Sequence, residues 1–392
     1  MNDNISVMVL GLRGFPQVQG GVETHAEHLY TELARMGCEV EVVVRGSYQP
    51  ASNPDVWKGI RFTRLWAPRQ RALEAIAHTF AGVLLAAWRR PDVLHIHAIG
   101  PAFFTPLARL LGLRVVVTHH GPDYDRQKWG RAARFVLRLG ERFGMGWSSE
   151  RIVISKLIRS LVRDKYQRGS TFIPNGVELP DSPPGTQAMQ TFDLQPGRYV
   201  LLVSRLVPEK RHLDLIEAFA LAEVNGWKLV LVGAADHPDE YMRRVLRAAR
   251  QTPNVVCTGF QSGPGLRELY AHAGLFVLPS SHEGLPIALL EALSHGLPAI
   301  ASDIPANREL GHLGVEFYPV GDVRSLAGRM RARMLRERSV AEAAAVQQRV
   351  AESYCWKHIA SETRAVYARI LGRAAAPRRP LIHNEGVDLS EQ

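Results

Sequence analysis

One stretch in the C-terminal half of the sequence constrains the fold more than any other. Residues 276–278 form a short apolar run, residues 287–294 have the composition of a helix, and residues 299–301 form a second apolar run. Pro286 stands at the first turn of the expected helix, and Gly296 is placed to end it. A strand, a helix and a second strand in this order predict the crossover unit of a parallel sheet.

The same alternation recurs in both halves of the chain. Expected strand–helix–strand units cover residues 7–10, 22–36 and 39–45 in the first half and residues 199–204, 213–223 and 228–232 in the second. At 392 residues the chain is long enough for two separate cores. These patterns predict the α/β class, with two Rossmann-like domains facing a cleft. The Pro-, Ser- and Gly-rich residues 180–185 mark the boundary, so we expect domains at residues 1–182 and 183–355.

Two carboxylates mark the crossover unit. Glu283 lies at the entrance of the expected helix, and Glu291 follows eight residues later inside the apolar run 289–293. An acid at a helix start has an ordinary explanation, since carboxylates favour the positive end of the helix dipole. Glu291 lacks that explanation, and a buried carboxylate needs a partner. A ligand rich in hydroxyl groups would supply one.

Further candidate residues lie where strands end, which is the edge at which parallel sheets bind ligands. Arg205 and Lys210 follow the expected strand 199–204. A guanidinium fork together with a point charge suits a diphosphate, and the alternative is a pair of ordinary surface cations. Gly20 and Gly21 end a glycine-rich connection between the first strand and the first helix, a position that cradles phosphate in doubly wound sheets. Taken alone, the connection is equally open to being only a turn, and it does not fit the G-x-G-x-x-G fingerprint.

Histidines end two of the expected strands. His95 and His97 lie on the same side of one strand, which invites a metal hypothesis. A catalytic zinc site would need a third histidine or carboxylate ligand, and the sequence places none. We therefore interpret the pair as a strand end at the mouth of the cleft and predict no metal site. His119 and His120 follow the next strand, and the choice between them as a ligand-facing residue stays open.

Several of these residues together resemble the signature of family-4 retaining glycosyltransferases, whose fold is called GT-B. The resemblance rests on the spacing Glu283-x7-Glu291, the turn Gly284-Leu285-Pro286 and the sequence Gly296-Leu297-Pro298. It implies that Glu291 hydrogen-bonds the ribose of a nucleotide-sugar and that Glu283 lies beside the transferred sugar. It also implies that backbone amides of the turn approach sugar hydroxyls and phosphate, as a helix N-terminus does for anions.

Other motifs extend the resemblance from Val7 to about Leu371. The sequences Gly11-x-Arg13-Gly14-x-Pro16 and Gly20-Gly21-x-Glu23-Thr24 resemble a subgroup that includes rhamnosyltransferase-like enzymes of polysaccharide assembly. The resemblance implies that the paired glycines approach the donor diphosphate, and that Arg205 and Lys210 offset charge on the leaving nucleotide. It favours His120 beside the anomeric carbon because a glycine follows it. Residues 356–371 resemble the family's terminal helix, which crosses back to the first domain, and residues 372–392 are expected to be a flexible tail.

The expected function is transfer of a sugar from a nucleotide-sugar to a hydroxyl group, with retention of configuration. The subgroup implies a saccharide or lipid-linked saccharide acceptor in cell-surface polysaccharide synthesis. The expected catalytic residues are His120, Glu283, Arg205 and Lys210, and the donor-binding residues are Gly20, Gly21, Arg205, Lys210, Gly284, Leu285, Pro286 and Glu291. Neither a metal nor a cofactor is expected, because side chains offset the diphosphate charge. A nucleotide-sugar epimerase on the same fold and a non-catalytic membrane-associated scaffold are the alternatives.

The net charge of the chain indicates which kinds of partner it can bind. The 48 lysines and arginines exceed the 38 acidic residues, which gives a net charge of +10. Strong basicity indicates a polyanionic partner. No nucleic-acid reading module is recognisable, so we expect an anionic membrane surface and no nucleic acid. Three widely spaced cysteines, and an N-terminus without a basic segment before its short apolar run, indicate a cytoplasmic protein that meets the inner face of the plasma membrane.

Two segments have features of a membrane-facing surface. The mainly apolar helix expected at residues 72–88 is flanked by arginines, with Trp66 before it and Trp88 at its end. Such a helix suits a membrane interface, but a buried core helix with solvated flanks explains it too and is the interpretation we favour. The helix expected at residues 131–142 carries a basic stripe that would attract anionic lipid, formed by Arg131, Arg134, Arg138 and Arg142.

Overall fold

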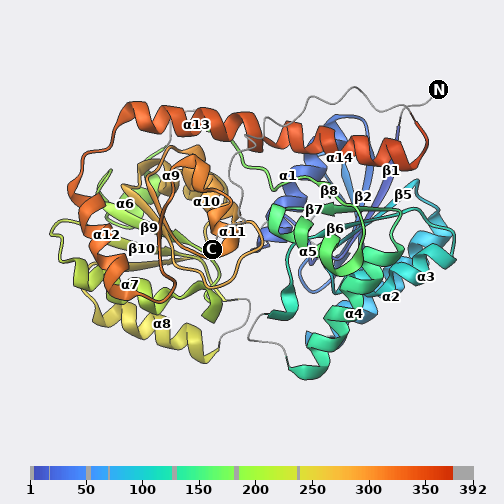
Figure 1. Ribbon diagram of the computed structural model, residues 1–392, viewed down its shortest axis with the longest axis horizontal. Helices are drawn as coiled ribbons and strands as arrows, with labels where there is room; N and C mark the ends of the chain where they lie inside the picture. The colour runs from blue at the N-terminus through green and yellow to red at the C-terminus, as the bar shows by residue number, and fades with distance from the viewer. Residues whose placement is uncertain are drawn as a thin grey trace.

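The computed structural model describes residues 4–16, 18–49, 54–68, 71–125, 130–180, 185–235 and 239–373. They form two α/β domains that lie side by side, each built on one sheet (Figure 1). The two Rossmann-like domains expected from the sequence are therefore present.

The first domain contains an eight-stranded sheet in the order β3-β4-β2-β1-β5-β6-β7-β8. All neighbouring strands are parallel except the short hairpin β3–β4. The strands are β1 (Ser6–Leu10), β2 (Glu39–Arg45), β3 (Val56–Trp57), β4 (Ile60–Leu65), β5 (Val93–His97), β6 (Val115–His119), β7 (Glu150–Val153) and β8 (Thr171–Phe172). The central strands are almost continuously buried, as expected when helices cover both faces of a parallel sheet.

The second domain contains a six-stranded parallel sheet in the order β11-β10-β9-β12-β13-β14. Its strands are β9 (Tyr199–Val203), β10 (Lys228–Val232), β11 (Val255–Gly259), β12 (Leu275–Leu278), β13 (Ala299–Ser302) and β14 (Glu316–Tyr318). This order is that of a doubly wound sheet, in which the chain starts in the middle, winds to one edge and then returns to wind to the other.

Helices connect the strands in both domains. Those of the first domain are α1 (Gly21–Arg35), α2 (Arg71–Arg89), α3 (Thr105–Leu110), α4 (Arg131–Trp147) and α5 (Lys156–Tyr166), with the 3-10 turns η1 (Pro101–Phe104) and η2 (Asp123–Asp125). Those of the second are α6 (Gln187–Thr191), α7 (His212–Ala222), α8 (Glu240–Gln251), α9 (Gly263–His272), α10 (Ile287–Ser294), α11 (Pro305–Arg308), α12 (Val323–Leu335) and α13 (Val340–Tyr354), with η3 (Pro208–Lys210) and η4 (Gly311–Leu313). The final helix is α14 (Trp356–Ile370).

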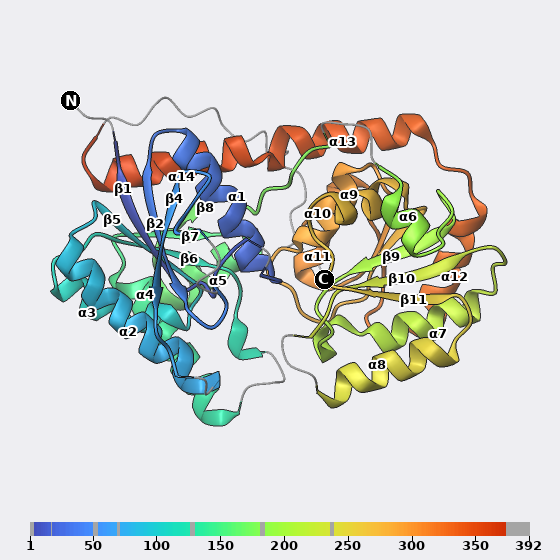
Figure 2. The same ribbon diagram turned by 180° about the vertical axis from the view of Figure 1, so that it is seen from behind.

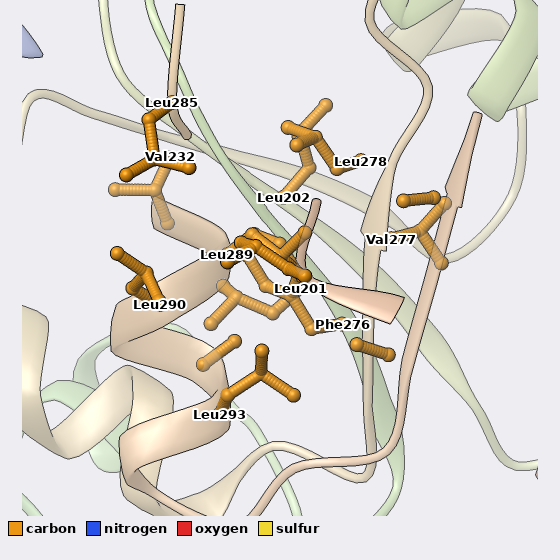
Figure 3. Close-up of a cluster of buried hydrophobic side chains, with 14 of the residues drawn as sticks. Leu201, Leu202, Val232, Phe276, Val277, Leu278, Leu285, Leu289, Leu290 and Leu293 are labelled. Atoms are coloured by element: carbon orange, nitrogen blue, oxygen red, sulfur yellow. The ribbon is translucent and has the colours of Figure 1, made fainter. Parts of the chain in front are cut away.

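The crossover unit predicted first is confirmed. Helix α10 has the expected bounds and connects the parallel neighbours β12 and β13. Leu289, Leu290 and Leu293 of α10 lie in a buried apolar cluster with residues of β9 and β12 (Figure 3). Burying one leucine side chain is worth ~1.5–3 kcal/mol, so the apolar face of α10 fixes where its N-terminus lies against the sheet.

The last two helices tie the domains together. Helix α13 lies along the second domain, and α14 returns to pack on α1 of the first (Figure 2). At the crossing, the Val177 N–H donates to the Tyr354 carbonyl over 2.7 Å. The Trp356 ring fills the space beside Gly176, where a Cβ atom would lie 2.6 Å from the indole. The helix expected at residues 356–371 therefore does run back to the first domain.

Some expectations differ from the structure. Helix α4 continues five residues beyond the expected end, to Trp147. Helix α2 is not a fully buried core helix, because one side of it is exposed. Residues 181–184 of the expected linker and residues 374–392 of the expected tail lie outside the described residues. Among the described residues, no helix is both long and apolar enough to span a bilayer.

Candidate active site

Both sheets reverse their winding direction at one point, between β1 and β5 in the first domain and between β9 and β12 in the second. Loops at such a point diverge and leave a crevice in which α/β sheets bind ligands. Here two loops meet across the domains: a Cβ atom on Gly284, after β12, would lie 2.0 Å from the His120 carbonyl oxygen, after β6. A Cβ atom on Gly121 would lie 3.5 Å from the Gly284 Cα atom. A side chain at Gly284 would clash with the backbone, so this contact depends on glycine.

Lys210 and Glu283 form an ion pair on the second domain. The Lys210 Nζ atom lies 2.5 Å from Glu283 Oε1, and the two side chains are 17% and 10% exposed. Lys210 ends η3 after β9, and Glu283 lies in the loop after β12, so the pair spans the point where the winding reverses. The Lys210 charge is therefore already paired with a carboxylate, and an anion that enters the site would bind Lys210 together with Glu283.

Arg205 links this region to the first domain. Its charge helps to lower the pKa of Glu23, which lies in the first turn of α1. Burial, the largest influence, raises the pKa of Glu23, but the charge and hydrogen bond of Arg13 outweigh it. The Arg13 Nε atom donates to Glu23 Oε1 over 2.9 Å. No signal in the sequence pairs Arg13 with Glu23, although both lie in the glycine-rich motif.

The two glycines of that motif have different surroundings. A Cβ atom on Gly20 would lie 2.2 Å from the Glu23 carboxylate, whereas one on Gly21 would meet no heavy atom within 4 Å. Just before them, the Gln19 side chain accepts a hydrogen bond of 3.2 Å from the Ala234 N–H at the end of β10. The glycine-rich connection therefore reaches the second domain and presents Gly21 to open space.

Glu291 has a protein partner that the sequence did not indicate. The Tyr270 hydroxyl of α9 donates to Glu291 Oε2 over 2.7 Å. The second carboxylate oxygen makes no hydrogen bond within the part of the chain that the structure describes. Burial raises the pKa of Glu291 to about 7, and the bond from Tyr270 opposes that shift. Tyr270 therefore supplies the partner that this acid was expected to need for one of its two oxygens, and the other oxygen is available to a ligand.

The structure separates the two adjacent histidines. The buried His119 Nε2 donates to Glu141 Oε1 over 3.0 Å, while its Nδ1 accepts from the Gly121 N–H over 3.1 Å. Both ring nitrogens of His119 are thereby used inside the first domain. His120 is only partly buried and lies at the contact with Gly284. It is the member of the pair that can meet a ligand.

Three histidines gather beneath this contact. Ring nitrogens of His25 on α1, His97 on β5 and His120 lie within 4.8 Å of one another. The sequence placed no further ligand beside the strand histidines, whereas the structure brings His25 and His120 to His97 and leaves His95 outside this group. His97 Nδ1 and His120 Nε2 share a hydrogen bond of 2.9 Å, so these two nitrogens are already engaged with each other.

The turn before α10 is held from the other domain. The buried Asn175 donates its Nδ2–H to the Leu285 carbonyl over 2.9 Å. The Leu285 side chain itself is buried in the second domain (Figure 3), so only its backbone is available to a ligand. Pro286 caps the N-terminus of α10 with an extended backbone. The sequence showed Asn175 only as part of a turn, because its partner is far away in the chain.

Two doubly wound domains with their strand ends facing one another define the GT-B fold. Residues 20–176 match the family described as "Glycosyl transferase 4-like domain", and residues 190–347 match "Glycosyl transferases group 1". Together the two matches span most of the chain. The chain belongs to this glycosyltransferase family, as the motifs indicated.

Full-length relatives and solved structures agree. The chain is 28% identical to a glycogen synthase of Mycobacterium tuberculosis, over 94% of this chain and 96% of the relative. It is 26% identical to a GDP-mannose:cellobiosyl-diphosphopolyprenol alpha-mannosyltransferase of Komagataeibacter xylinus, over 92% and 93%. The crystal structure of Anabaena HepE in complex with UDP-glucose superposes with a TM-score of 0.76 at 17% identity, covering 94% of this chain and 99% of that one. The last similarity concerns the fold.

Proposed function

We propose that this glycosyltransferase moves a sugar from a nucleoside-diphosphate sugar to a hydroxyl group of a saccharide acceptor, with retention of configuration and without a metal ion. One observation carries the donor side of the proposal. The Lys210–Glu283 pair, Arg205 and the open oxygen of Glu291 belong to loops and a helix at the strand ends of the second sheet, while Gly21 and His120 belong to the facing ends of the first.

The charges suit a diphosphate. Arg205 and Lys210 lie in the loop after β9, and the N-terminus of α10 points its N–H groups toward the same edge of the sheet. Diphosphate oxygens would compete with Glu283 for Lys210, and Glu283 would then be released toward the sugar hydroxyls. The open oxygen of Glu291 would accept a ribose hydroxyl.

The reaction that fits this arrangement breaks the bond between the anomeric carbon and the diphosphate oxygen. A bond from the acceptor oxygen to the same face of the anomeric carbon forms in its place, and the acceptor proton passes to the departing phosphate oxygen. Arg205 and Lys210 stabilise the negative charge that grows on the diphosphate. His120, held against Gly284, would hydrogen-bond the sugar beside the reacting carbon.

A membrane-bound acceptor is the second part of the proposal. The mannosyltransferase relative is named for a diphosphopolyprenol-linked acceptor, which supports a lipid-linked saccharide here. Helix α2 exposes Ile76, Phe80, Leu84 and Trp88 at four-residue spacing, which places them on one side of the helix. We call these four residues the α2 stripe. An exposed apolar stripe near a basic helix is typical of a surface that lies on an anionic membrane.

A thermal-shift panel of nucleoside-diphosphate sugars tests the donor assignment. One donor should raise the melting temperature, since a ligand at 100 times its Kd adds about 2.7 kcal/mol of stability. Glu291→Ala should abolish the shift, and unchanged binding and transfer in that variant would overturn the site. With acceptor present, NMR should show a product with the anomeric configuration of the donor. Sugar inversion without an acceptor would instead identify an epimerase, and donor-independent function a scaffold.

A further inference from the structure

A line of neutral side chains ends at His120. The Tyr30 hydroxyl of α1 lies 2.5 Å from His97 Nε2, and His97 Nδ1 lies 2.9 Å from His120 Nε2. Tyr30 and His97 are fully buried, whereas His120 is partly exposed at the contact between the domains. The rings of His97 and His120 are stacked, with centroids 5.2 Å apart. The orientation of the His120 ring is therefore set by Tyr30 and His97, which are buried from solvent.

The same line continues to the terminal helix. The Tyr30 hydroxyl also lies 2.8 Å from His95 Nδ1, and the Tyr367 hydroxyl of α14 lies 2.6 Å from the same nitrogen. His95 Nε2 is hydrogen-bonded to Thr118 Oγ1 over 2.7 Å. The line thus connects α14, α1, β5 and the loop after β6. We call Tyr367, His95, Tyr30 and His97 the buried relay.

Counting protons shows what the relay does to His120. A neutral imidazole has one donor and one acceptor nitrogen. If His97 Nε2 accepts from Tyr30, its Nδ1 must donate to His120 Nε2, and His120 then carries its proton on Nδ1. If the direction reverses, so does the tautomer of His120. Either way the proton position of His120 follows from Tyr30 through His97.

The proton count above assumes neutral histidine rings, and the pKa values of the three histidines support that assumption. Burial lowers the pKa of His95 and of His120 to about 3, and that of His97 well below its usual range. The neighbouring histidines lower these pKa values further, since one charged ring would repel the next. All three rings are neutral at physiological pH, and the Nδ1 atom of His120 makes no hydrogen bond within the described residues. That atom is the relay's free end.

We propose that Tyr30 and His97 are positioning residues for sugar transfer, which fix the ring orientation and the tautomer of His120 so that its Nδ1 presents one defined hydrogen-bonding role to a hydroxyl of the donor sugar. The proposal rests on the proposed function only in placing a donor sugar beside His120. Tyr367 connects the relay to α14, so the helix that returns to the first domain also supports the site.

Kinetics of matched variants test the proposal. Tyr30→Phe and His97→Leu keep the ring or the bulk but break the relay, and each should lower kcat ~10-fold or more while leaving the KM for the donor within about twofold. His97→Asn should recover part of the loss, because its side-chain amide offers both a donor and an acceptor and so can replace the Nδ1 atom in either direction of the relay. Tyr199→Phe is the control: it removes a buried hydroxyl that donates to the Leu269 carbonyl over 2.6 Å, yet it lies in the second domain away from the relay. It should lower the melting temperature without lowering kcat.

Histidine tautomers give a readout that needs no activity. In protein labelled with ¹⁵N-histidine, His97 and His120 should each show a single neutral tautomer, and Tyr30→Phe should convert His120 to a mixture. Mixed tautomers in the wild type would overturn the relay, as would variants that lose stability but keep kcat. Stoichiometric zinc that is lost in His25→Ala would also overturn it, because a metal would occupy the nitrogens that the relay uses. Absence of transfer with every donor would instead contradict the proposed function and leave the tautomer result to decide the relay.

Discussion

Glu291 illustrates how one side chain is both unfavourable for folding and suited to binding. Its pKa is raised from 4.5 to about 7 by burial, so between these values the unfolded chain releases a proton that the folded chain keeps. The free energy of unfolding is therefore highest, as far as Glu291 is concerned, below pH 4.5. It decreases as the pH rises from 4.5 and has lost this contribution once the pH passes through about 7. Glu291→Gln should therefore be close to wild type in stability at pH 5 and about 2 kcal/mol more stable at pH 8, after allowance for partial exposure.

Urea unfolding at both pH values measures this difference. Glu352→Gln is a suitable control, since Glu352 is exposed on α13 and its replacement should give the same small change at pH 5 and at pH 8. An equal effect of Glu291→Gln at the two pH values would show that the carboxyl titrates normally and is not desolvated.

Lys210 and Glu283 can be separated by a double substitution. Lys210→Met leaves the largely buried Glu283 carboxylate unpaired, so it should destabilise the protein by up to about 3 kcal/mol and lower kcat by ~10²-fold or more. Adding Glu283→Gln removes the stranded charge and should restore most of the stability. It should not restore transfer, because the cation that we propose to bind the diphosphate is still missing. Recovery of activity in the double variant would show that Lys210 acts only as the partner of Glu283.

At the scale of elements, the N-terminus of α5 is capped from the other domain. The Glu309 carboxylate, which follows α11, accepts from the Lys156 N–H over 2.9 Å and from the Leu157 N–H over 2.8 Å. Ser155 of the first domain accepts from Ile158 at the same helix end. The Glu309 carboxylate of the second domain thus binds two N–H groups that would otherwise lack a partner and lies at the positive end of the α5 dipole. Both interactions join the two domains.

Glu309→Ala should loosen this junction. It should cost about 1–2 kcal/mol of stability, the usual effect of losing a helix cap. Because the cap joins the domains, it should also raise the donor KM more than it lowers kcat. Differential scanning calorimetry and steady-state kinetics measure the two effects. Asp239→Ala removes the side chain that caps α8 within the second domain and should lower stability alone. Equal KM changes in both variants would argue against an interdomain role.

Elements with local end signals were predictable, whereas contacts between distant residues were not. Helix α10 has its expected bounds because Pro286 and Gly296 specify its two ends in the sequence. Helix α4 continues past the expected end at residue 142 because its small residues pack closely: a Cβ atom on Gly144 would lie 2.8 Å from Ala102. Such packing is set by tertiary contacts and leaves no periodic signal.

The candidate site shows the same division. The spacing of the acids and the cations pointed to their loops, since strand ends of a parallel sheet converge. Tyr270 beneath Glu291 and Asn175 beneath Leu285 were missed, because each bonds a residue more than twenty positions away. His25 was missed as a neighbour of His97 for the same reason. Only the fold brings helix α1 over the end of β5.

At the scale of the whole molecule, apolar and basic surfaces coincide. Helices α2, α3 and α4 lie side by side on one face of the first domain (Figures 1 and 2). The α2 stripe ends at Trp88, which is 77% exposed, and Phe135 of α4 is 63% exposed. Arg131, Arg138 and Arg142 of α4 are exposed as well, whereas Arg134 is partly buried, so three of the four arginines of the expected stripe are available. The sequence favoured a core role for α2, and its exposed side instead supports the membrane interpretation.

Vesicle flotation tests that surface as a whole. The protein should float with vesicles that contain anionic phospholipid, but not with purely zwitterionic ones, and binding should fall as salt is raised because the attraction is screened. At about 1 kcal/mol per arginine, the double variant Arg131→Glu/Arg142→Glu should bind at least tenfold more weakly. Trp88→Ser should also weaken binding, but by a factor that salt does not change. The charge-matched control Arg324→Glu/Arg329→Glu lies on α12 of the second domain and should bind as the wild type does. Equal losses in both double variants would mean that net charge, and not this face, attracts the protein to the membrane.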